Sequence, residues 1–350
     1  LFLYNTLIIL LRILTLNQTL PIDDFLAQKF STIIDVRSPK EYEHSHIPNA
    51  INFPVLNDEE FQQIGTLYKK DSFNAKILGA SFVCKNISHH LLNLKHQITP
   101  ARPFGIYCAR GGMRSNSFGI VLKNIGYRVV VLKGGYKSYR TEVTQTLQDK
   151  PNHNFITLIG PTGSGKSEII HAFDDSLDIE GIARHLGSSF GGIYGMQPSV
   201  KMFQNLLFER LKSLTNSPFV LVEGESKKLG NLILPSPLYQ AYHNAPKILI
   251  LSPLEQRIQR IVAQYGKISQ DFFKNSMQKI APFMKKQFWQ EAQEAFLRRD
   301  LQKVAEILLV EYYDKVYKKE SFKSVIYYQN TTQVIEEIKA FAKEFYKIKE

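Results

Sequence analysis

The feature that most constrains this chain is a glycine-rich octapeptide, Gly-Pro-Thr-Gly-Ser-Gly-Lys-Ser, at residues 160–167. An apolar, β-branched run precedes it at residues 155–159, and a helix-compatible stretch follows at residues 168–173. Strand, glycine loop and helix in this order predict a phosphate-binding loop, because the glycines let consecutive backbone amides turn toward one anion. The pattern indicates a diphosphate group and leaves open which diphosphate binds.

The residues of this phosphate loop have separate expected roles. The backbone amides from Thr162 to Lys166 would face the anion, and the helix N-terminus would add partial positive charge. Lys166 would reach the terminal phosphate oxygens, and Ser167 would ligate Mg²⁺ if a metal is used. The predicted diphosphate-binding residues are Gly160, Thr162, Gly163, Ser164, Gly165, Lys166 and Ser167.

Two further segments are candidates for the same site. An apolar run at residues 219–222 is followed by Glu223, and Glu225 lies two residues later. Phosphate-loop folds place a metal- or water-orienting carboxylate at such a strand end, so both are candidates; the alternative is a pair of solvated acids. The glycine- and serine-rich segment 180–192 either supplies further backbone donors to a ligand or forms a flexible loop.

A second loop, Cys-Ala-Arg-Gly-Gly-Met-Arg-Ser, occupies residues 108–115. It follows a short apolar strand at residues 104–107 and leads into a helix expected over residues 115–126. Cys108 is the predicted catalytic residue, because backbone amides, the helix dipole and the two arginines of the loop would all stabilise its thiolate. The residues expected to support it are Arg110, Gly111, Arg114 and Ser115.

The cysteine content and residues 1–16 indicate in which cellular compartment the protein is expected. Two cysteines in dissimilar settings argue against a disulfide scaffold and fit a reducing cytoplasm. Cys84 lacks a glycine loop and is expected to be a small buried apolar residue. Residues 1–16 are apolar, but Arg12 interrupts them, and they are too short to span a bilayer. We expect a cytoplasmic protein with no membrane partner. Residues 1–16 are expected to be an extra segment that reflects an over-extended reading frame or a truncated sequence; a membrane-surface helix is the alternative.

Two stretches before the cysteine loop carry a family resemblance. Residues 32–42 contain Asp-Val-Arg at the end of an apolar run, and residues 46–54 read His-Ile-Pro-Asn-Ala-Ile-Asn-Phe-Pro. With the cysteine loop and the run at 129–136, they resemble the rhodanese (sulfurtransferase) domain. The resemblance implies that Cys108 carries sulfur as a persulfide, and that Asp35 and Arg37 fix the architecture rather than perform chemistry.

A rhodanese domain followed by a phosphate loop resembles the tRNA 2-selenouridine synthase family, from about residue 20 to about residue 317. The specific stretches are residues 20–25, 57–60, 64–69, 108–115, 160–167, 185–191, 197–199 and 222–230. The resemblance implies an α/β chain with a rhodanese-like α/β domain at residues 17–145 and a linker at 146–154. A P-loop NTPase-like α/β domain with a helical C-terminal region would then occupy residues 155–350.

The resemblance also implies an activity. The family acts on 2-thiouridine at the wobble position of certain tRNAs: geranyl diphosphate alkylates the sulfur, and selenophosphate then replaces the geranylthio group with selenium. The implied partners are tRNA and an upstream enzyme that produces selenophosphate. No firmly bound cofactor is implied, and Mg²⁺ is the one candidate ion.

The chain departs from the family pattern at several positions. Leu186 stands where an arginine is expected, an aspartate is expected near Gly224, and a further arginine is expected near Phe61. A late His-Tyr-Asp-Pro-like motif occurs as Tyr-Tyr-Asp-Lys at residues 312–315. Each change removes an anion or base contact, whereas Cys108, Lys166 and the loop glycines are intact.

The charge balance favours a polyanionic partner such as tRNA. Lysine and arginine number 44 against 32 acidic residues, which gives a net charge of +12. Two other functions remain open. One is an ATP-dependent tRNA sulfurtransferase that uses a rhodanese persulfide, and the other is a non-catalytic tRNA-binding protein that retains both folds.

The charge excess generates a first prediction. If phosphate contacts supply much of the affinity for tRNA, log affinity should fall roughly linearly with log salt concentration, because bound counterions are released. Filter binding of tRNA across a salt series measures the slope, and a slope near zero would contradict electrostatic binding.

Overall fold

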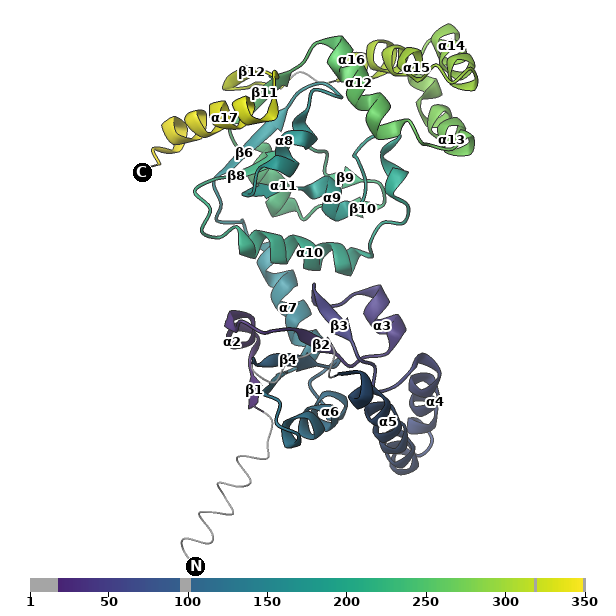
Figure 1. Cartoon of the computed structure of the whole chain (residues 1–350), viewed down its shortest axis with the longest axis vertical. Helices are drawn as coiled ribbons and strands as arrows, with labels where there is room; N and C mark the ends of the chain where they lie inside the picture. The colour runs from purple at the N-terminus through teal and green to yellow at the C-terminus, as the bar shows by residue number, and fades with distance from the viewer. Residues whose placement is uncertain (1–17, 95–101, 318–319, 349–350) are drawn as a thin grey trace, which may run out of the picture. The chain divides into compact units, whose positions relative to one another are not determined.

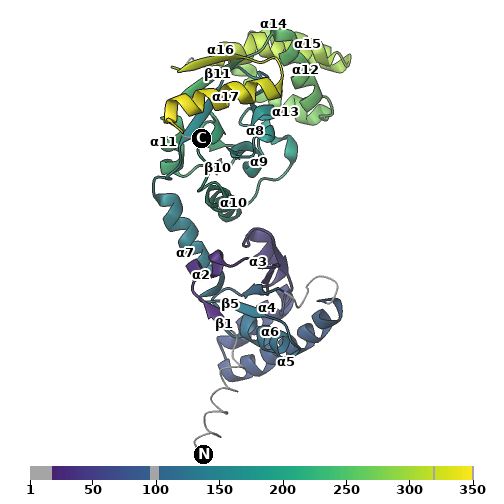
Figure 2. The same ribbon diagram turned by 60° about the vertical axis from the view of Figure 1, so that its left-hand side comes forward.

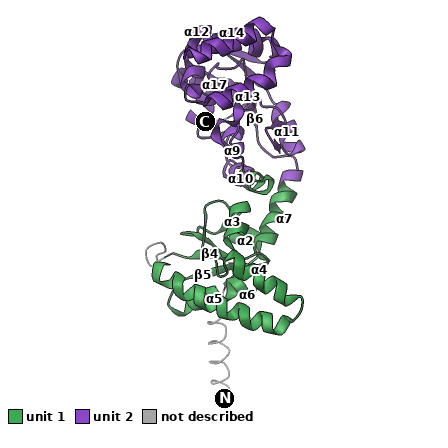
Figure 3. Cartoon of the chain, turned by 90° about the vertical axis from the view of Figure 1, so that its right-hand side faces the viewer, with its two compact units in different colours: residues 1–146, 199–206 green, residues 147–198, 207–350 purple. Residues whose placement is uncertain are grey.

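The computed structural model describes residues 18–94, 102–317 and 320–348. The chain divides into two compact units (Figure 3). Unit 1 holds the described residues up to Thr146 together with Ser199–Leu206, and unit 2 holds Leu147–Pro198 and the described residues from Leu207 onward. The helix α10 (Val200–Ser213) therefore begins in unit 1 and ends in unit 2.

Unit 1 is built on a five-stranded parallel sheet in the order β1-β5-β4-β2-β3 (Figure 1). Its strands are β1 (Gln18–Leu20), β2 (Ile33–Asp35), β3 (Ala50–Asn52), β4 (Phe104–Tyr107) and β5 (Val129–Leu132). Its helices are α2 (Ile22–Ala27), α3 (Pro39–His44), α4 (Asp58–Tyr68), α5 (Ser72–Leu94), α6 (Met113–Asn124) and α7 (Gly135–Gln148). The central strands β4 and β5 are buried along their whole length, as expected for a parallel sheet with both faces covered.

Local sequence explains how two helices of unit 1, α3 and α4, begin. At the start of α4, the Asn57 side chain accepts a hydrogen bond from the Glu60 amide (2.8 Å), and Glu60 accepts one from the Asn57 amide (2.9 Å). This capping box satisfies two amides that the helix itself leaves unpaired. The helix α3 begins similarly, since the Ser38 amide donates to Glu41 (3.1 Å).

Unit 2 contains a second five-stranded parallel sheet, in the order β12-β11-β6-β8-β7. Its strands are β6 (Phe155–Ile159), β7 (Ser176–Leu177), β8 (Val220–Glu223), β11 (Lys247–Leu251) and β12 (Ser324–Tyr327), with a separate hairpin of β9 (Lys228–Leu229) and β10 (Leu232–Ile233). The helices around the sheet are α8 (Lys166–Ala172), α9 (Ile179–Ala183), α11 (Ser236–His243), α12 (Leu254–Tyr265) and α17 (Thr331–Tyr346). The last of these packs against α8 and β12 (Figure 2).

A helical region follows β11 and has its own apolar core. Its elements are α13 (Gln270–Ile280), α14 (Lys286–Leu297), α15 (Leu301–Leu308), a π-helical turn η3 (Leu309–Tyr313) and α16 (Asp314–Val316). Phe273 on α13 and Phe296 on α14 stack with ring centroids 3.9 Å apart. The core of this region is distinct from the core beneath the second sheet.

The predicted fold class is confirmed, while some details differ. The strands expected at residues 104–107 and 155–159 are β4 and β6, and the helix expected from residue 115 begins two residues earlier, at Met113. The expected linker overlaps the end of α7, which continues to Gln148. The apolar segment 1–16 lies outside the described residues. Within them, no helix has the length and apolar character needed to cross a membrane.

The expectation that Cys84 is buried was wrong. Cys84 is exposed on α5, whereas Val83 and Ile87 of the same helix are buried in the core of unit 1. Neighbouring positions on a helix point about 100° apart, so the residue after a core position turns toward solvent. An apolar local sequence does not fix which helix face a residue occupies.

A buried ion pair organises the centre of unit 1. The Arg37 guanidinium donates to both Asp35 oxygens (3.0 and 2.6 Å) and to the Ser45 carbonyl (2.7 Å). Asn52 donates to the Asp35 carbonyl (2.9 Å). The contacts tie β2 to β3 and to the chain after α3, in agreement with the architectural role expected for Asp35 and Arg37.

This ion pair generates a stability prediction. Asp35→Ala leaves a buried guanidinium unpaired and should destabilise unit 1 by about 3–5 kcal/mol. The exposed Glu43→Ala is the control and should change stability by less than about 0.5 kcal/mol. Urea unfolding followed by circular dichroism measures both, and equal effects would contradict a structural role for the pair.

Candidate functional site

The phosphate loop in unit 2 has its backbone carbonyls held outward. Three donors outside the loop bind three consecutive carbonyl oxygens: Arg257 Nε to Thr162 (2.8 Å), Arg260 Nη1 to Gly163 (3.1 Å) and Ser252 Oγ to Ser164 (2.9 Å). Since the C=O and N–H of a peptide point in opposite directions, fixing these carbonyls outward turns the following amides toward the inside of the loop. This is the backbone arrangement that binds an anion.

Two glycines make this turn possible. Gly160 has φ 151° and Gly165 has φ 96°. A Cβ on Gly160 would lie 2.3 Å from the Ile250 carbonyl oxygen, and one on Gly165 would lie 2.6 Å from the Tyr328 ring. Both positions therefore require glycine on conformational and steric grounds.

Lys166 and Ser167 converge on one carboxylate. Lys166 Nζ lies 3.1 Å from the Gly160 carbonyl oxygen and 3.4 Å from Glu223 Oε1, and Ser167 Oγ donates to Glu223 Oε2 (3.2 Å). Glu223 is the last residue of β8, next to β6 in the sheet. The structure thus brings together the loop and one of the two carboxylates predicted from sequence, at the edge of a cavity of about 790 Å³.

Glu225 also lies in this site, together with Glu180, which the sequence did not single out. One oxygen from each of Glu180, Glu223 and Glu225 lies within 4.8 Å of the others. Burial, followed by repulsion from Glu223 and Glu225, raises the pKa of Glu180 strongly, and burial and Glu223 raise the pKa of Glu225 to about 7. Clustered carboxylate oxygens are the ligands that Mg²⁺ prefers, so these residues fit a divalent cation.

The glycine- and serine-rich segment lies against these carboxylates. A Cβ on Gly187 would be 2.2 Å from Glu225 Oε2, and Gly187 and Ser188 both line the cavity. The segment is therefore part of the site wall. Glu180 is the first residue of this segment and lies in the short helix α9. Only its burial in the fold distinguishes it from a solvated acid.

The cysteine loop of unit 1 stabilises a thiolate through hydrogen bonds. Cys108 Sγ accepts hydrogen bonds from the Gly112 amide (3.2 Å) and the Ser115 hydroxyl (3.3 Å). Burial alone would raise the pKa of this thiol, but the bonds from the Ser115 hydroxyl and from backbone amides outweigh burial and lower the pKa. Hydrogen bonds of this kind favour the thiolate form of Cys108.

The loop is shaped by the segment after β5. The amides of Tyr136 and Lys137 donate to the carbonyls of Cys108 (2.8 Å) and Ala109 (3.0 Å). A Cβ on Gly135 would lie 2.2 Å from the Cys108 carbonyl oxygen, and Gly111 has φ 65°. Two tight backbone segments therefore interlock and leave room for glycine alone at these points.

The loop arginines have different environments. Arg114 forms an ion pair with Glu41 (2.7 Å) and lies over the Phe61 ring, 5.0 Å from its centroid. It therefore braces the loop against α3 and α4, and hydrogen bonds rather than Arg114 stabilise the thiolate. Arg110 lines a pocket that adjoins the loop.

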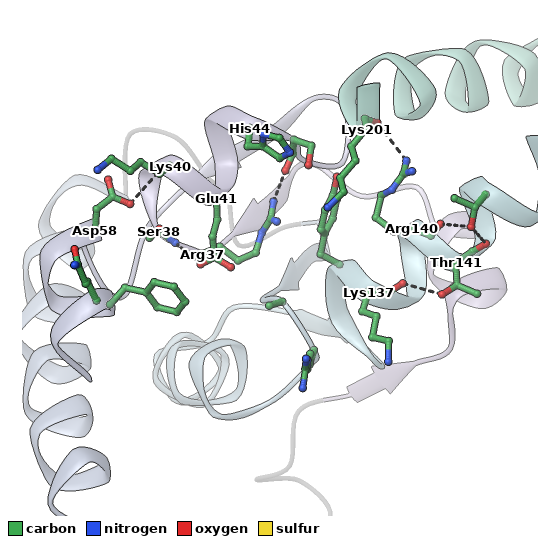
Figure 4. Close-up of a pocket in the computed structure, with 17 residues that line it drawn as sticks. Arg37, Ser38, Lys40, Glu41, His44, Asp58, Lys137, Arg140, Thr141 and Lys201 are labelled. Carbon is green, nitrogen blue, oxygen red and sulfur yellow. Dashed lines mark hydrogen bonds between the residues drawn. The ribbon is translucent and has the colours of Figure 1, made fainter. Parts of the chain in front are cut away.

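This pocket, about 990 Å³, is rich in cationic side chains. Its basic lining residues are Arg37, Lys40, Arg110, Lys137, Arg140 and Lys201, set against the acids Glu41 and Asp58. Figure 4 shows Arg140 on α7 bonded to the Lys201 backbone at the start of α10 (3.2 Å). Because α3, α7 and α10 supply four of these six cations from distant parts of the sequence, no local motif could have revealed the pocket.

Three of the four departures from the family pattern, Leu186, Gly224 and Phe61, are considered with these two sites. Leu186 and Gly224 line the phosphate-loop cavity, and Phe61 lines the basic pocket beneath Arg114. A Cβ on Gly224 would already lie 2.9 Å from the Ile159 side chain. An aspartate at Gly224 would therefore require Ile159 to shift.

The fold and the two sites define a class of protein: a rhodanese-like unit with a thiolate-stabilising loop, joined on one chain to a phosphate-loop unit. The Rhodanese-like domain family model matches residues 22–142, and the model for the tRNA 2-selenouridine synthase AAA domain matches residues 153–297. The chain belongs to the tRNA 2-selenouridine synthase family.

Curated relatives support this assignment. A tRNA 2-selenouridine synthase from Nitrosomonas europaea is 36% identical over 71% of this chain and 68% of its own length. One from Pseudomonas syringae pv. syringae is also 36% identical, over 67% of this chain and 65% of its own length. The matched region thus spans about two thirds of each relative. Among solved structures, a rhodanese-related protein from Thermoplasma volcanium is 20% identical over 36% of this chain and 92% of its own, with a TM-score of 0.23.

The thiol geometry generates a prediction. Ser115→Ala removes the hydroxyl that donates to Cys108, so the thiol pKa should rise and the thiolate fraction at pH 7 should fall roughly tenfold. The pH dependence of iodoacetamide alkylation measures this shift, in a Cys84→Ser background so that Cys108 is the one thiol. Ser117→Ala on the same helix is the matched control, and an equal alkylation midpoint in both variants would contradict the assignment.

Proposed function

We propose that the chain is a tRNA 2-selenouridine synthase that converts wobble 2-thiouridine to 2-selenouridine through S-geranyl-2-thiouridine. The observation that carries the proposal is the pairing of two chemically different sites in a chain of this family. Unit 1 has a thiol of lowered pKa beside a cationic pocket, and unit 2 has an anion-binding loop beside buried carboxylates. The proposed substrates are tRNA, geranyl diphosphate and selenophosphate, the last supplied by an upstream enzyme.

The phosphate loop suits the alkylation step. The thiouridine sulfur would attack C1 of geranyl diphosphate, the C1–O bond would break, and the uracil N3 proton would leave as the carbon–sulfur bond forms. Negative charge then develops on the departing diphosphate, where the loop amides and Lys166 supply positive charge. Fixed donors of this kind stabilise a transition state by about 3–4 kcal/mol each.

The unit 1 site suits the selenium step. The selenium of selenophosphate would bond to C2 of the base, the C2–S bond would break, and geranylthiol would leave after taking up a proton. Attack of water on phosphorus would then break the P–Se bond and release phosphate, which leaves selenium on C2. Cys108 is assigned to this step because its environment favours the reactive thiolate. The lysines and arginines around the adjoining pocket suit the phosphate of selenophosphate and the tRNA backbone.

The proposal includes a Mg²⁺ ion bound at the site of unit 2. Ser167 and Glu223, with Glu180 and Glu225 nearby, are the residues that would hold it. Bound there, the ion would neutralise charge on the diphosphate. Lys166 Nζ lies 3.4 Å from Glu223 Oε1. The lysine ammonium therefore balances the negative charge of this carboxylate when no ion is bound.

Separate defects at the two sites provide the test. Lys166→Ala should abolish geranyl transfer, with a loss of at least about 10²–10³ in rate. Cys108→Ser should block selenium entry while S-geranyl-2-thiouridine still forms and accumulates, because a serine hydroxyl is not ionised at neutral pH. Mass spectrometry of tRNA nucleosides after incubation with geranyl diphosphate and selenophosphate distinguishes these products.

The controls are Lys339→Ala and Cys84→Ser, which make the same chemical changes at exposed positions. Full selenouridine from Cys108→Ser, or loss of geranylation in that variant, would refute the two-site assignment. Hydrolysis of ATP stimulated by tRNA, with no binding of geranyl diphosphate, would instead support an ATP-dependent sulfurtransferase.

A further inference from the structure

The helical region of unit 2 carries a group of lysines without acidic neighbours in sequence. Residues 272–290 run from α13 through a 3₁₀ turn η2 (Ala281–Phe283) into α14 and contain no aspartate or glutamate. Their four exposed lysines, called the lysine surface below, are Lys274, Lys279, Lys285 and Lys286. Within the described residues none of the four forms an ion pair, whereas Lys303 and Lys315 of the same region pair with glutamates.

The electrostatics at the start of α14 are unfavourable without an added anion. A helix N-terminus carries partial positive charge and is stabilised by acidic residues, as in α4 with Asp58, Glu59 and Glu60 in its first turn. In α14 the N-cap is Lys285, the first helical residue is Lys286, and no side chain caps the helix. Positive charges therefore gather at this helix end, and an external anion would relieve their repulsion.

An aromatic ring is exposed between these lysines. The Phe283 side chain is 64% exposed, although Ile280 and Met284 beside it are buried in the core of the helical region. The Trp289 indole donates to the Met277 carbonyl (3.0 Å), which ties α14 to α13. The ring therefore lies on a turn whose two helices are fixed to each other. Lysines around an exposed aromatic ring suit single-stranded nucleic acid, because its phosphates carry charge and its bases stack.

The lysine surface adjoins the wall of the phosphate-loop cavity. Phe190, in the glycine- and serine-rich segment of that wall, packs against Phe272 and Phe273 of α13, with ring centroids 6.5 and 6.0 Å apart. Burial, followed by the charge of Lys279, lowers the pKa of His185, which belongs to the same segment. A strand bound along the lysines would therefore pass close to the cavity.

We infer that the lysine surface binds the phosphate backbone of tRNA and that Phe283 stacks against one of its unpaired bases. The inference rests on the proposed function and gives the phosphate-loop unit an RNA contact of its own, separate from the basic pocket of unit 1. The anticodon loop, which contains the wobble position, is single-stranded and offers both phosphates and accessible bases. An anionic membrane would also attract lysines, but it would not account for their place beside the phosphate-loop cavity.

A charge-neutralised variant tests the surface. Lys279→Gln, Lys285→Gln and Lys286→Gln together should weaken tRNA binding at least about tenfold at about 0.1 M salt, because three phosphate contacts are lost. The slope of log affinity against log salt should become shallower by about 2. Filter binding of tRNA carrying wobble 2-thiouridine to the full chain measures both. The thermal unfolding midpoint should not fall, since two of the charges leave a helix N-terminus. A lower midpoint would assign the lysines to the fold and overturn the inference.

The matched control removes the same charge elsewhere in unit 2. Lys323, Lys339 and Lys347 are exposed on or beside β12 and α17, which Figure 1 shows away from α13 and α14. Changing these three lysines to glutamine should leave tRNA affinity within about threefold of the wild type, because net charge alone acts weakly at this salt concentration. Equal losses in the two triple variants would reduce the effect to net charge and overturn the inference.

Phe283→Leu separates stacking from charge, because it keeps an apolar side chain and removes the ring. It should weaken tRNA binding at least about fivefold with an unchanged salt slope. Phe345→Leu on α17 is the matched control, since Phe345 is also exposed. Vesicles containing phosphatidylserine test the membrane alternative. A triple-lysine variant that loses vesicle binding but keeps its affinity for tRNA would overturn the inference.

The outcomes separate this inference from the proposed function. If the triple-lysine and Phe283 variants weaken tRNA binding selectively, but the wild type forms neither S-geranyl-2-thiouridine nor 2-selenouridine, the inference stands and the proposed function fails. If the wild type forms 2-selenouridine and neither variant changes the KM for tRNA, the proposed function stands and the inference is wrong.

Discussion

The chemistry of unit 2 depends on the outward anchoring of the phosphate-loop carbonyls. A glycine loop has many conformations, and only one of them directs its amides to a common anion. Arg257 and Arg260 select that conformation by binding the carbonyls of Thr162 and Gly163. Arg257 is itself held by two bonds to Asp314 (3.0 and 2.6 Å), a geometry that the planar guanidinium permits and a lysine would not.

The cysteine loop of unit 1 applies the same physical principle to a thiolate. In each unit the reactive loop follows a central parallel strand and leads into a helix, β4 to α6 in unit 1 and β6 to α8 in unit 2. In open parallel sheets, ligands bind beyond the carboxyl ends of the strands, where backbone amides are unpaired. Backbone donors therefore create both sites, and side chains such as Ser115 and Lys166 adjust them.

Sequence predicted the parts of the molecule that depend on local order. A strand, a glycine loop and a helix are contiguous, so β4, β6 and both loops were recognisable, and Glu223 could be placed by its position at a strand end. Contacts between distant segments were not predictable. Glu180, the anchoring arginines and the cations around the basic pocket act through positions that only the fold brings together. Cys84 shows the same limit, because helix rotation rather than local hydrophobicity decides its exposure.

Electrostatics links these distant residues to the function. A diphosphate and three carboxylates cannot share a buried site while all are ionised, since like charges at such distances raise each other's pKa. Burial, followed by this repulsion, raises the pKa values of Glu180 and Glu225. In the folded protein the pKa of each of these carboxyls lies above its unfolded value of about 4.5. Above that pH the unfolded chain releases protons that the folded protein keeps. Unit 2 therefore loses stability as the pH rises from about 4.5 toward 7. A divalent cation would supply the missing positive charge and favour the ionised carboxylates. Diphosphate binding and cation binding are therefore expected to be linked at this site. Lys166 takes part in both, because its ammonium group would contact the diphosphate and lies 3.4 Å from Glu223, a proposed ligand of the cation.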